Sequence, residues 1–226
     1  ILDMEVEMLD NLNIKCTLCG CAEVELQDYK IRNITDDSCK MYKCKNCETH
    51  FMYPLPSQDL SEYYDGTFRE EVHTADYYDY TELDKVFNNF LSEAKLRTER
   101  VKNDLSVNDT ILEIGSSVGY FTAAISDYAK DVYATEWDSK ARAYIKDRLA
   151  KYNIHVAKDP EDFETKFDKI FMFHVLEHIE KPIDFLKNLK QLLNENGKIY
   201  IEVPNVDDVM LKTFRCRPFI EHYYKK

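Results

Sequence analysis

Four cysteines near the N-terminus have the spacing of a metal site: Cys16, Cys19, Cys44 and Cys47. They form two C-x2-C pairs, and each pair can direct two thiolates toward one ion. Two such pairs complete the tetrahedral sulfur shell that Zn2+ prefers. Because four protein ligands leave no open coordination position, we expect a structural zinc that folds a small ribbon-like module. Cys21 and Cys39 lie outside the two pairs and are expected not to bind the ion.

A second cluster lies in the stretch FHVLEHIEKP at residues 173–182, where His174, Glu177 and His178 spell H-x-x-E-H. On one continuous helix this pattern is a zinc-peptidase signature, so a zinc-dependent hydrolase is one interpretation. However, the apolar run FDKIFMF before it predicts a buried strand. Pro182 follows closely and leaves little helix for a peptidase site. The sequence therefore favours a site at the end of a strand, with another chemistry.

Composition limits the class of protein. The 226 residues can bury one full core, with room for a small appended module. A formal net charge of −12 disfavours a nucleic-acid or anionic-membrane partner. No apolar run approaches the roughly 20 residues of a membrane span. Six of the seven cysteines lie between positions 16 and 47, which suits metal binding in a reducing compartment, so we expect a cytoplasmic protein.

Strands and helices alternate in the second half of the chain. The expected strands are DTILEIG, DVYATE, NIHVA, FDKIFMF and GKIYIEV, and the expected helices are YFTAAISDYA, SKARAYIKDRLAKY and IDFLKNLKQLL. This alternation predicts an α/β fold with a doubly wound, mostly parallel sheet and helices on both faces. Ligands of such sheets bind beyond the carboxyl ends of the strands.

Helix boundaries have separate signals. Thr81 and Asp84 suggest a capping box that starts a helix running to about residue 103. Pro182 suits the first turn of a later helix, which Gly197 is expected to stop. The expected organisation is a zinc-binding module over 1–52, a tyrosine-rich connecting segment over 53–81 and an α/β domain over 82–226. The tyrosines either pack between the domains or form a substrate-facing lip.

The first strand of the α/β region ends in EIGSSVG, where Glu113, Gly115 and Gly119 form the pattern E-x-G-x-x-x-G. Glycine lets the backbone approach a ligand closely, and the following helix N-terminus favours a carboxylate or phosphate. The next strand ends at Glu136, whose carboxylate can accept both hydroxyls of a ribose. A nicotinamide site would show G-x-G-x-x-G, so this pattern favours a different nucleoside cofactor.

Six motifs in order resemble those of the bacterial, Rossmann-like (class I) S-adenosylmethionine-dependent methyltransferases: CTLCG…CKNC, YPLPSQDLSEYYD, ILEIGSSVGYF, YATEWD, HVLEHIEKP and IYIEVPN. Within this family the chain is similar to the group that carries an N-terminal zinc-binding module and includes sugar C-methyltransferases. The resemblance runs from about Cys16 to Asn205. It implies methyl transfer from S-adenosylmethionine to a small-molecule acceptor, and we expect a sugar or glycan precursor.

The resemblance also implies roles for individual residues. The loop at the methionine end of the cofactor corresponds to Glu113, Gly115, Ser116 and Gly119. Glu136 corresponds to the ribose-binding acid, Trp137 to the apolar neighbour of adenine, and Asp159 to a position near the adenine amino group. Ser117 stands where the family usually has a glycine.

Methyl transfer is an in-line displacement at a sulfonium carbon, so the protein mainly positions the acceptor and removes a proton. His174 is the first candidate for base or for acceptor orientation, because imidazole titrates near neutrality. Glu177 and His178 are further catalytic candidates at the same edge. A zinc-dependent hydrolase at these three residues, or a non-catalytic adaptor whose zinc module binds a protein, are the alternatives.

The last residues bear on the sheet. The resemblance implies a helix and two further strands after Asn205, and FIEHYYKK looks like the start of that segment. We therefore expect the natural product to extend past Lys226, or a partner to cover the strand GKIYIEV, which would otherwise be an edge. His222 and Tyr223 lie in this segment as possible acceptor-side residues.

Overall fold

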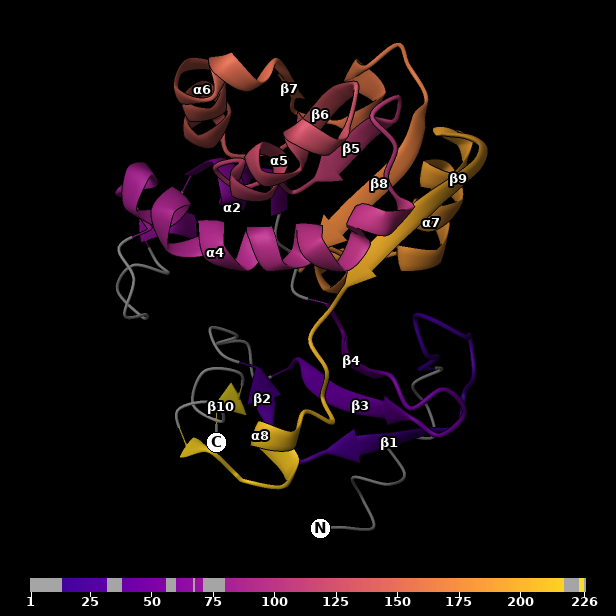
Figure 1. The fold of residues 1–226 in the computed structure, drawn as a ribbon. Coiled ribbons are helices and arrows are strands. Elements are labelled where there is room, and N and C mark those ends of the chain that lie inside the picture. The colour runs from indigo at the N-terminus through magenta and orange to yellow at the C-terminus, as the bar shows by residue number, and fades with distance from the viewer. Residues whose placement is uncertain are drawn as a thin grey trace, which may run out of the picture. The chain divides into compact units, whose positions relative to one another are not determined.

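The computed structural model describes residues 14–31, 38–55, 60–66, 68–70, 80–217 and 224–225. His222 and Tyr223 therefore lie outside the described residues. The chain divides into two compact units (Figure 1). The first unit comprises Ile1–Ser57, Ile179–Phe185 and Pro204–Lys226, and the second comprises Gln58–His178 and Leu186–Val203.

The first unit is built on a three-stranded antiparallel sheet of order β1-β3-β4, with bounds β1 (Val24–Gln27), β3 (Lys40–Cys44) and β4 (His50–Tyr53). Strand β1 lies in the segment VELQDYKI and β3 in the segment CKMYKC. A small buried cluster stabilises this sheet, and it contains Ile14, Cys16, Tyr42, Cys44 and Phe51. Two of its members are predicted metal ligands, so the core of this unit and its cysteine site share side chains.

The segment after the parallel sheet returns to the first unit. It contains the short helix α8 (Val209–Lys212), whose N-cap Asp208 accepts a hydrogen bond from the Met210 backbone. Further on, β10 (Tyr224–Lys225) pairs antiparallel with β2 (Lys30–Ile31). The sequence suggested that this segment leads toward further strands of the parallel sheet. Its described residues instead belong to the cysteine-containing unit.

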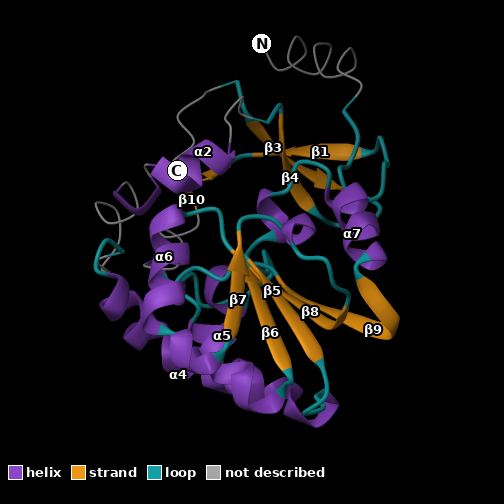
Figure 2. Ribbon diagram, turned by 90° about the horizontal axis from the view of Figure 1, so that it is seen from above, coloured by secondary structure: helices purple, strands orange, loops and turns teal. Residues whose placement is uncertain are grey.

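The second unit contains a five-stranded parallel sheet of order β7-β6-β5-β8-β9, as predicted (Figure 2). Its strands are β5 (Thr110–Ile114), β6 (Asp131–Thr135), β7 (Ile154–Ala157), β8 (Phe167–Phe173) and β9 (Leu193–Glu202). Strand β8 lies between β5 and β9, and its second half, residues 170–173, is a continuous apolar run, as a strand covered on both faces requires. Among the described strands β9 pairs only with β8, and its Ile201 is 42% exposed.

The helices that accompany the parallel sheet follow the predicted order, except that the first of them was not predicted and the last begins in the first unit. They are α2 (Leu60–Gly66), α4 (Leu83–Val101), α5 (Tyr120–Ile125), α6 (Ser139–Arg148) and α7 (Pro182–Gln191), with 3-10 turns η1 (Lys102–Asp104), η2 (Ser126–Tyr128), η3 (Ala150–Tyr152), η4 (Pro160–Asp162) and η5 (Leu176–His178). Figure 2 shows α4, α5 and α6 along one side of the strands. Ala94, Phe121 and Phe171 belong to the buried cluster on that side. Among the described residues, no helix has the length and apolarity needed to cross a membrane.

The predicted capping box at Thr81 and Asp84 was wrong. The N-cap of α4 is Glu82, which makes no side-chain capping hydrogen bond. The Asp84 carboxylate accepts hydrogen bonds from Tyr144 Oη at 2.9 Å and from Arg148 at 3.1 Å. The Asp84 carboxylate, which the local pattern predicted to cap α4, therefore makes a tertiary contact with α6.

The prediction that Gly197 stops a helix was also wrong. Helix α7 ends at Gln191, and Gly197 lies inside β9. The register of β8 and β9 shifts between Phe167 and Lys169. A Cβ on Gly197 would lie 3.0 Å from the Asn194 carbonyl oxygen and 3.1 Å from that of Phe167. The glycine is therefore explained by the close backbone approach at this irregularity.

Candidate active site and candidate metal centre

The carboxyl ends of β5 and β8 border the point where the strand order reverses. The chain passes from β5 to β6 on one side and from β8 to β9 on the other, although β5 and β8 are paired neighbours. Such a point is where open α/β sheets bind ligands. The glycine loop at 115–119 follows β5, and the histidine cluster at 174–178 follows β8. The structure thus brings the two predicted clusters to one edge.

The glycine loop needs left-handed backbone at three positions. The φ angles are 70° at Gly115, 51° at Ser117 and 76° at Gly119. A Cβ on Gly115 would lie 2.5 Å from Cγ2 of Val175, which follows His174 in the neighbouring loop. Glycine at 115 therefore allows the two loops to approach each other. The φ angle at Ser117 explains why a glycine suits that position.

The loop also carries two buried polar groups. Ser116 is 1% exposed, and its Oγ has no hydrogen-bond partner among the described atoms. The Glu113 carboxylate is 3% exposed and accepts a hydrogen bond from Thr122 Oγ1. Burial disfavours the charged form and raises the pKa of Glu113 to about 8. A positively charged ligand would stabilise the Glu113 carboxylate, and the Ser116 hydroxyl can make a further hydrogen bond.

The Glu136 carboxylate is held by two backbone groups. Ser117 N donates to Oε2 at 2.7 Å, and Asp138 N donates to Oε1 at 3.0 Å. Burial raises the pKa of Glu136 above its usual range. A carboxylate has about four lone-pair sites, and two are used here. Glu136 can therefore still accept two hydroxyl groups, one on each oxygen, as recognition of a ribose requires.

Trp137 and Asp159 form one unit beside Glu136. The indole Nε1 donates to Asp159 Oδ1 at 2.9 Å, so the carboxylate sets the plane of the ring. The Tyr64 ring from α2 lies 6.1 Å from the Trp137 ring and 6.0 Å from the His178 ring, between the centroids. Desolvation raises the pKa of Tyr64 well above its usual value. Tyr64 thus links the Trp137 indole to the histidine cluster.

Two polar contacts attach the tyrosine-rich segment to the start of α6. Asp65 Oδ1 accepts from Ser139 N at 2.6 Å. Arg69 forms an ion pair with Asp138, and both residues are buried. Asp138 is also the N-cap of α6. Because Asp138 lies two residues after Glu136, these contacts hold α2 beside the predicted ribose acid. Residues 60–66 and 68–70 of this segment are thus attached beside Glu136.

His174 lies directly after β8 with a left-handed φ of 56°. Its Nδ1 is 3.4 Å from Glu177 Oε1, and its Nε2 is 3.3 Å from Glu202 Oε1. The hydrogen bond with Glu177, and the charge of Glu202 in addition, raise the pKa of His174. Partial shielding from water lowers the pKa of His178. The two histidines therefore have opposite preferences for a proton.

Glu202 and Arg97 complete the histidine cluster and were missed from the sequence. Arg97 is 6% exposed, and its Nε lies 3.2 and 3.3 Å from the two Glu202 oxygens. Its guanidinium lies 4.6 Å from the centroid of the Phe173 ring. Glu202 lies within the quoted motif IYIEVPN, so an acid at a strand end was an available signal. The sequence carried no signal for Arg97, because a basic residue on an amphipathic helix is usually exposed to solvent.

The four cysteines of the two C-x2-C pairs come together in the first unit. Their Sγ atoms all lie within 4.8 Å of one another, with Cys16 to Cys47 at 3.6 Å and Cys19 to Cys44 at 3.5 Å. Four sulfurs about 2.3 Å from one zinc ion are about 3.8 Å apart in a tetrahedron. The cluster contains neither Cys21 nor Cys39. The sulfur positions therefore fit a zinc ion of this coordination.

The two cysteine pairs have the same local geometry. Gly20 N donates to Cys16 O, and Glu48 N donates to Cys44 O, each at 2.9 Å. The residue that closes each turn is left-handed, with φ 73° at Gly20 and φ 60° at Glu48. The turn presents both thiols of a pair on one side. This repeated turn gives both C-x2-C pairs the same local geometry at the shared cluster.

The H-x-x-E-H pattern does not lie on a continuous helix. His174 follows a strand, while Glu177 and His178 lie in the one-turn η5. Among the residues that the structure describes, the group placed to hold a metal is the four cysteines, and the histidine cluster forms no such group. The geometry that a zinc peptidase requires is therefore not formed by these residues.

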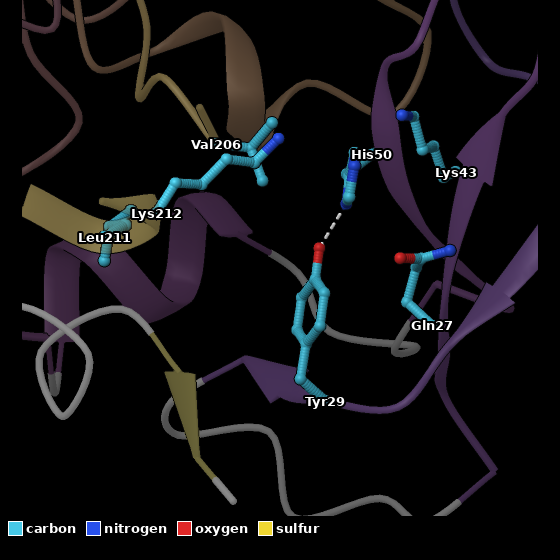
Figure 3. A pocket seen from close by; sticks show the side chains of 7 residues that line it. All are labelled: Gln27, Tyr29, Lys43, His50, Val206, Leu211 and Lys212. Carbon is cyan, nitrogen blue, oxygen red and sulfur yellow. Dashed lines mark hydrogen bonds between the residues drawn. The ribbon is translucent and has the colours of Figure 1, made fainter. Parts of the chain in front are cut away.

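A separate pocket of about 280 Å³ lies in the first unit (Figure 3). Its lining residues are Gln27, Tyr29, Lys43, His50, Val206, Leu211 and Lys212. Figure 3 shows the Tyr29 hydroxyl directed at the His50 ring, to which it is hydrogen bonded through Nδ1. Lys43 pairs with Glu48, and Lys212 pairs with Asp207. The two ammonium charges at the pocket are thus balanced by carboxylates.

Comparison with known proteins agrees with this geometry. Residues 78–224, well over half of the chain, match the profile of a family described as "Methyltransferase domain". A tRNA U34 carboxymethyltransferase of Campylobacter jejuni is 36% identical over 58 residues, which are 26% of this chain and 20% of that protein. A probable S-adenosylmethionine-dependent methyltransferase of Mycobacterium tuberculosis is 26% identical over 98 residues, 42% of this chain and 35% of its own length.

The chain thus spans well under half the length of these curated relatives. Among solved structures, the DhpI complex with S-adenosylhomocysteine (SAH) has a TM-score of 0.48 and 20% identity, and the match covers 65% of this chain and 70% of that one. The family match coincides with the five-stranded parallel sheet and its ligand edge. The chain belongs to the methyltransferase-domain family.

Proposed function

We propose that the edge formed by loops 115–119 and 174–178 binds S-adenosylmethionine and a small-molecule acceptor. The observation that carries this assignment is the hydrogen bonding of Glu136. Backbone N–H groups fix both of its carboxylate oxygens, and each oxygen can still accept one hydroxyl group. Trp137 offers an apolar ring beside it, and its plane is set by Asp159. These residues fit a ribose and an adenine.

The methionine end of the cofactor suits the buried groups of the glycine loop. S-adenosylmethionine supplies an activated methyl group and carries positive charge on its sulfonium and ammonium groups. Glu113 is the buried acid that such a charge would ionise, and Ser116 Oγ is a buried hydroxyl with no described partner. Gly115 and Gly119 keep this part of the loop free of side chains. The four residues therefore act in binding rather than in proton transfer.

The acceptor side is assigned to His174, Glu177 and His178. They follow β8, the strand beside β5, at the same edge as the cofactor loop. The work of these residues is to orient the acceptor, limit access of water and manage a proton. We propose a small molecule, such as a sugar or glycan precursor, because a net charge of −12 disfavours RNA. The relatives named tRNA U34 carboxymethyltransferase make RNA the competing acceptor.

The cysteine cluster is assigned to structural zinc. Its four sulfurs leave no open position for catalysis, and two of them belong to the core of the first unit. The zinc would stabilise that unit, and free thiols clustered for a metal suit the cytoplasm.

The test is cofactor binding by the full chain. Glu136→Ala should weaken binding of SAH by roughly tenfold to a hundredfold, because charge-assisted hydrogen bonds contribute about 1.5–3 kcal/mol. Calorimetry measures this change. Glu195→Ala, which removes an exposed acid near the amino end of β9, is the matched control. Equal affinity of Glu136→Ala and wild type would contradict the assignment of the ribose site.

A further inference from the structure

The His174 ring lies between two carboxylates. Glu177 faces Nδ1 and Glu202 faces Nε2, so both ring nitrogens have an acid within 3.4 Å. Contacts of this length are weak as single hydrogen bonds. They nevertheless place negative charge on both sides of one imidazole. This environment favours the ring with protons on both nitrogens.

Glu202 is held in place from behind. Both of its oxygens contact Arg97, a nearly buried residue that also pairs with Glu93 at 2.8 Å. Arg97 lowers the pKa of Glu202, so Glu202 remains a carboxylate at neutral pH. A planar guanidinium fixes the direction of a carboxylate, which a single ammonium cannot do. Glu202 is therefore fixed in both charge and orientation.

The backbone connects the same residues. Phe173, the last residue of β8, is the register partner of Glu202, the last residue of β9. His174 N then donates to Glu202 O at 2.9 Å. This hydrogen bond holds His174 in its left-handed conformation, which is uncommon for residues other than glycine. Glu202 thus restrains both the backbone and the ring of His174.

We propose that Glu202, anchored by Arg97, is a positioning residue that holds the His174 imidazole in one orientation at the acceptor side. The inference rests on the proposed role of His174. The charged groups that face the ring are Glu177 and Glu202, with Arg97 behind Glu202 and His178 one turn further along. Two facing carboxylates favour the imidazolium form of the ring over its neutral form. An imidazolium donates hydrogen bonds and has no lone pair for a proton, so His174 orients the acceptor rather than deprotonating it.

The test is a pH titration of the His174 side chain by 1H–15N NMR of the full chain saturated with SAH. His174→Gln identifies the signals by their loss among the six histidines. In wild type we expect His174 to stay doubly protonated above the pH at which an exposed histidine titrates. Glu202→Gln should lower that pKa, because the ring loses one of its two carboxylates. Arg97→Lys keeps the charge but not the planar contact, and should broaden the ring signals with a smaller change in pKa.

Glu195→Gln is the matched control, because it removes one exposed carboxylate from the same strand. It should leave the His174 titration unchanged. Affinity for SAH should remain within about twofold in all variants, since the proposed cofactor contacts lie elsewhere. A His174 that titrates identically in wild type and Glu202→Gln would overturn the positioning role. Loss of SAH binding by the wild type would instead count against the proposed cofactor site.

Discussion

Gly115→Ala tests the close approach of the cofactor loop and the histidine loop. At φ 70° an alanine is strained by about 1–2 kcal/mol. Its Cβ would also lie 2.5 Å from Val175 Cγ2, and overpacking of this kind costs about 1–3 kcal/mol. Alanine recovers roughly 0.4–1 kcal/mol by restricting the unfolded chain. We expect a loss of about 2–4 kcal/mol in the free energy of unfolding, measured by urea denaturation.

A double-mutant cycle separates the two causes. Val175→Ala removes the methyl group that the new Cβ would meet, but leaves the backbone strain. The double variant with Gly115→Ala and Val175→Ala should therefore lose about 1–3 kcal/mol less free energy of unfolding than the sum of the two single variants. Gly119→Ala has a similar φ of 76°, but its Cβ meets the end of the Leu149 side chain at 2.8 Å, which can move. It should show mainly the strain.

The same variants also test whether the two loops are coupled at His174. Val175 is the neighbour of His174, so displacement of Val175 should alter the His174 NMR signals in Gly115→Ala and not in Gly119→Ala. If the double variant were no more stable than Gly115→Ala, the contact with Val175 could not be the source of the loss. The proposed coupling between the two loops would then be wrong.

Three further predictions concern other parts of the chain. Cys44→Ser should lose the zinc and destabilise the first unit, and zinc-free wild-type protein in metal analysis would contradict the metal site. Tyr64→Ala should weaken SAH binding severalfold, because a ring pair contributes about 0.5–1.5 kcal/mol, whereas Tyr64→Phe should bind nearly as wild type. In calorimetry, equal affinities for both Tyr64 variants would contradict the ring contact. The pKa of Glu113 is raised to about 8, so the folded protein binds this proton more tightly than the unfolded chain does. The stability that the protonated carboxyl contributes is therefore fully present below the pKa of an unfolded carboxyl and is lost as pH rises through 8. In urea titrations without cofactor, wild type should therefore lose stability relative to Glu113→Gln between pH 6 and 9, and parallel curves would refute the shift.

The parallel sheet could be predicted because each strand is an apolar run of its own. FDKIFMF matches β8 residue for residue, and Pro182 begins α7 as expected. The cysteine cluster could be predicted as well, since C-x2-C spacing carries its own geometry. Each strand and each single C-x2-C pair lies within about ten consecutive residues.

The features that were missed depend on residues far apart in sequence. The partner of Arg97 is Glu202, and the pair forms only when α4 packs beside the end of β9. Asp84 pairs with Arg148, which is distant in sequence, and does not form the predicted helix cap. Tyr64 belonged to a segment whose tyrosines suggested either packing or a lip, and only the structure places it beside Trp137. Long-range pairing of polar groups has no periodicity that a sequence would show.

Trp137 is the single tryptophan of the chain. Its indole is hydrogen bonded to Asp159, lies beside the proposed adenine position and contacts the Tyr64 ring. Intrinsic indole fluorescence therefore originates from one place in the molecule, and that place is the proposed nucleoside end of the site. Occupancy of the cofactor pocket becomes an optical signal that needs no label and no methyl acceptor. A fluorescence titration can then screen candidate acceptors by their effect on cofactor affinity, before the product of the reaction is known.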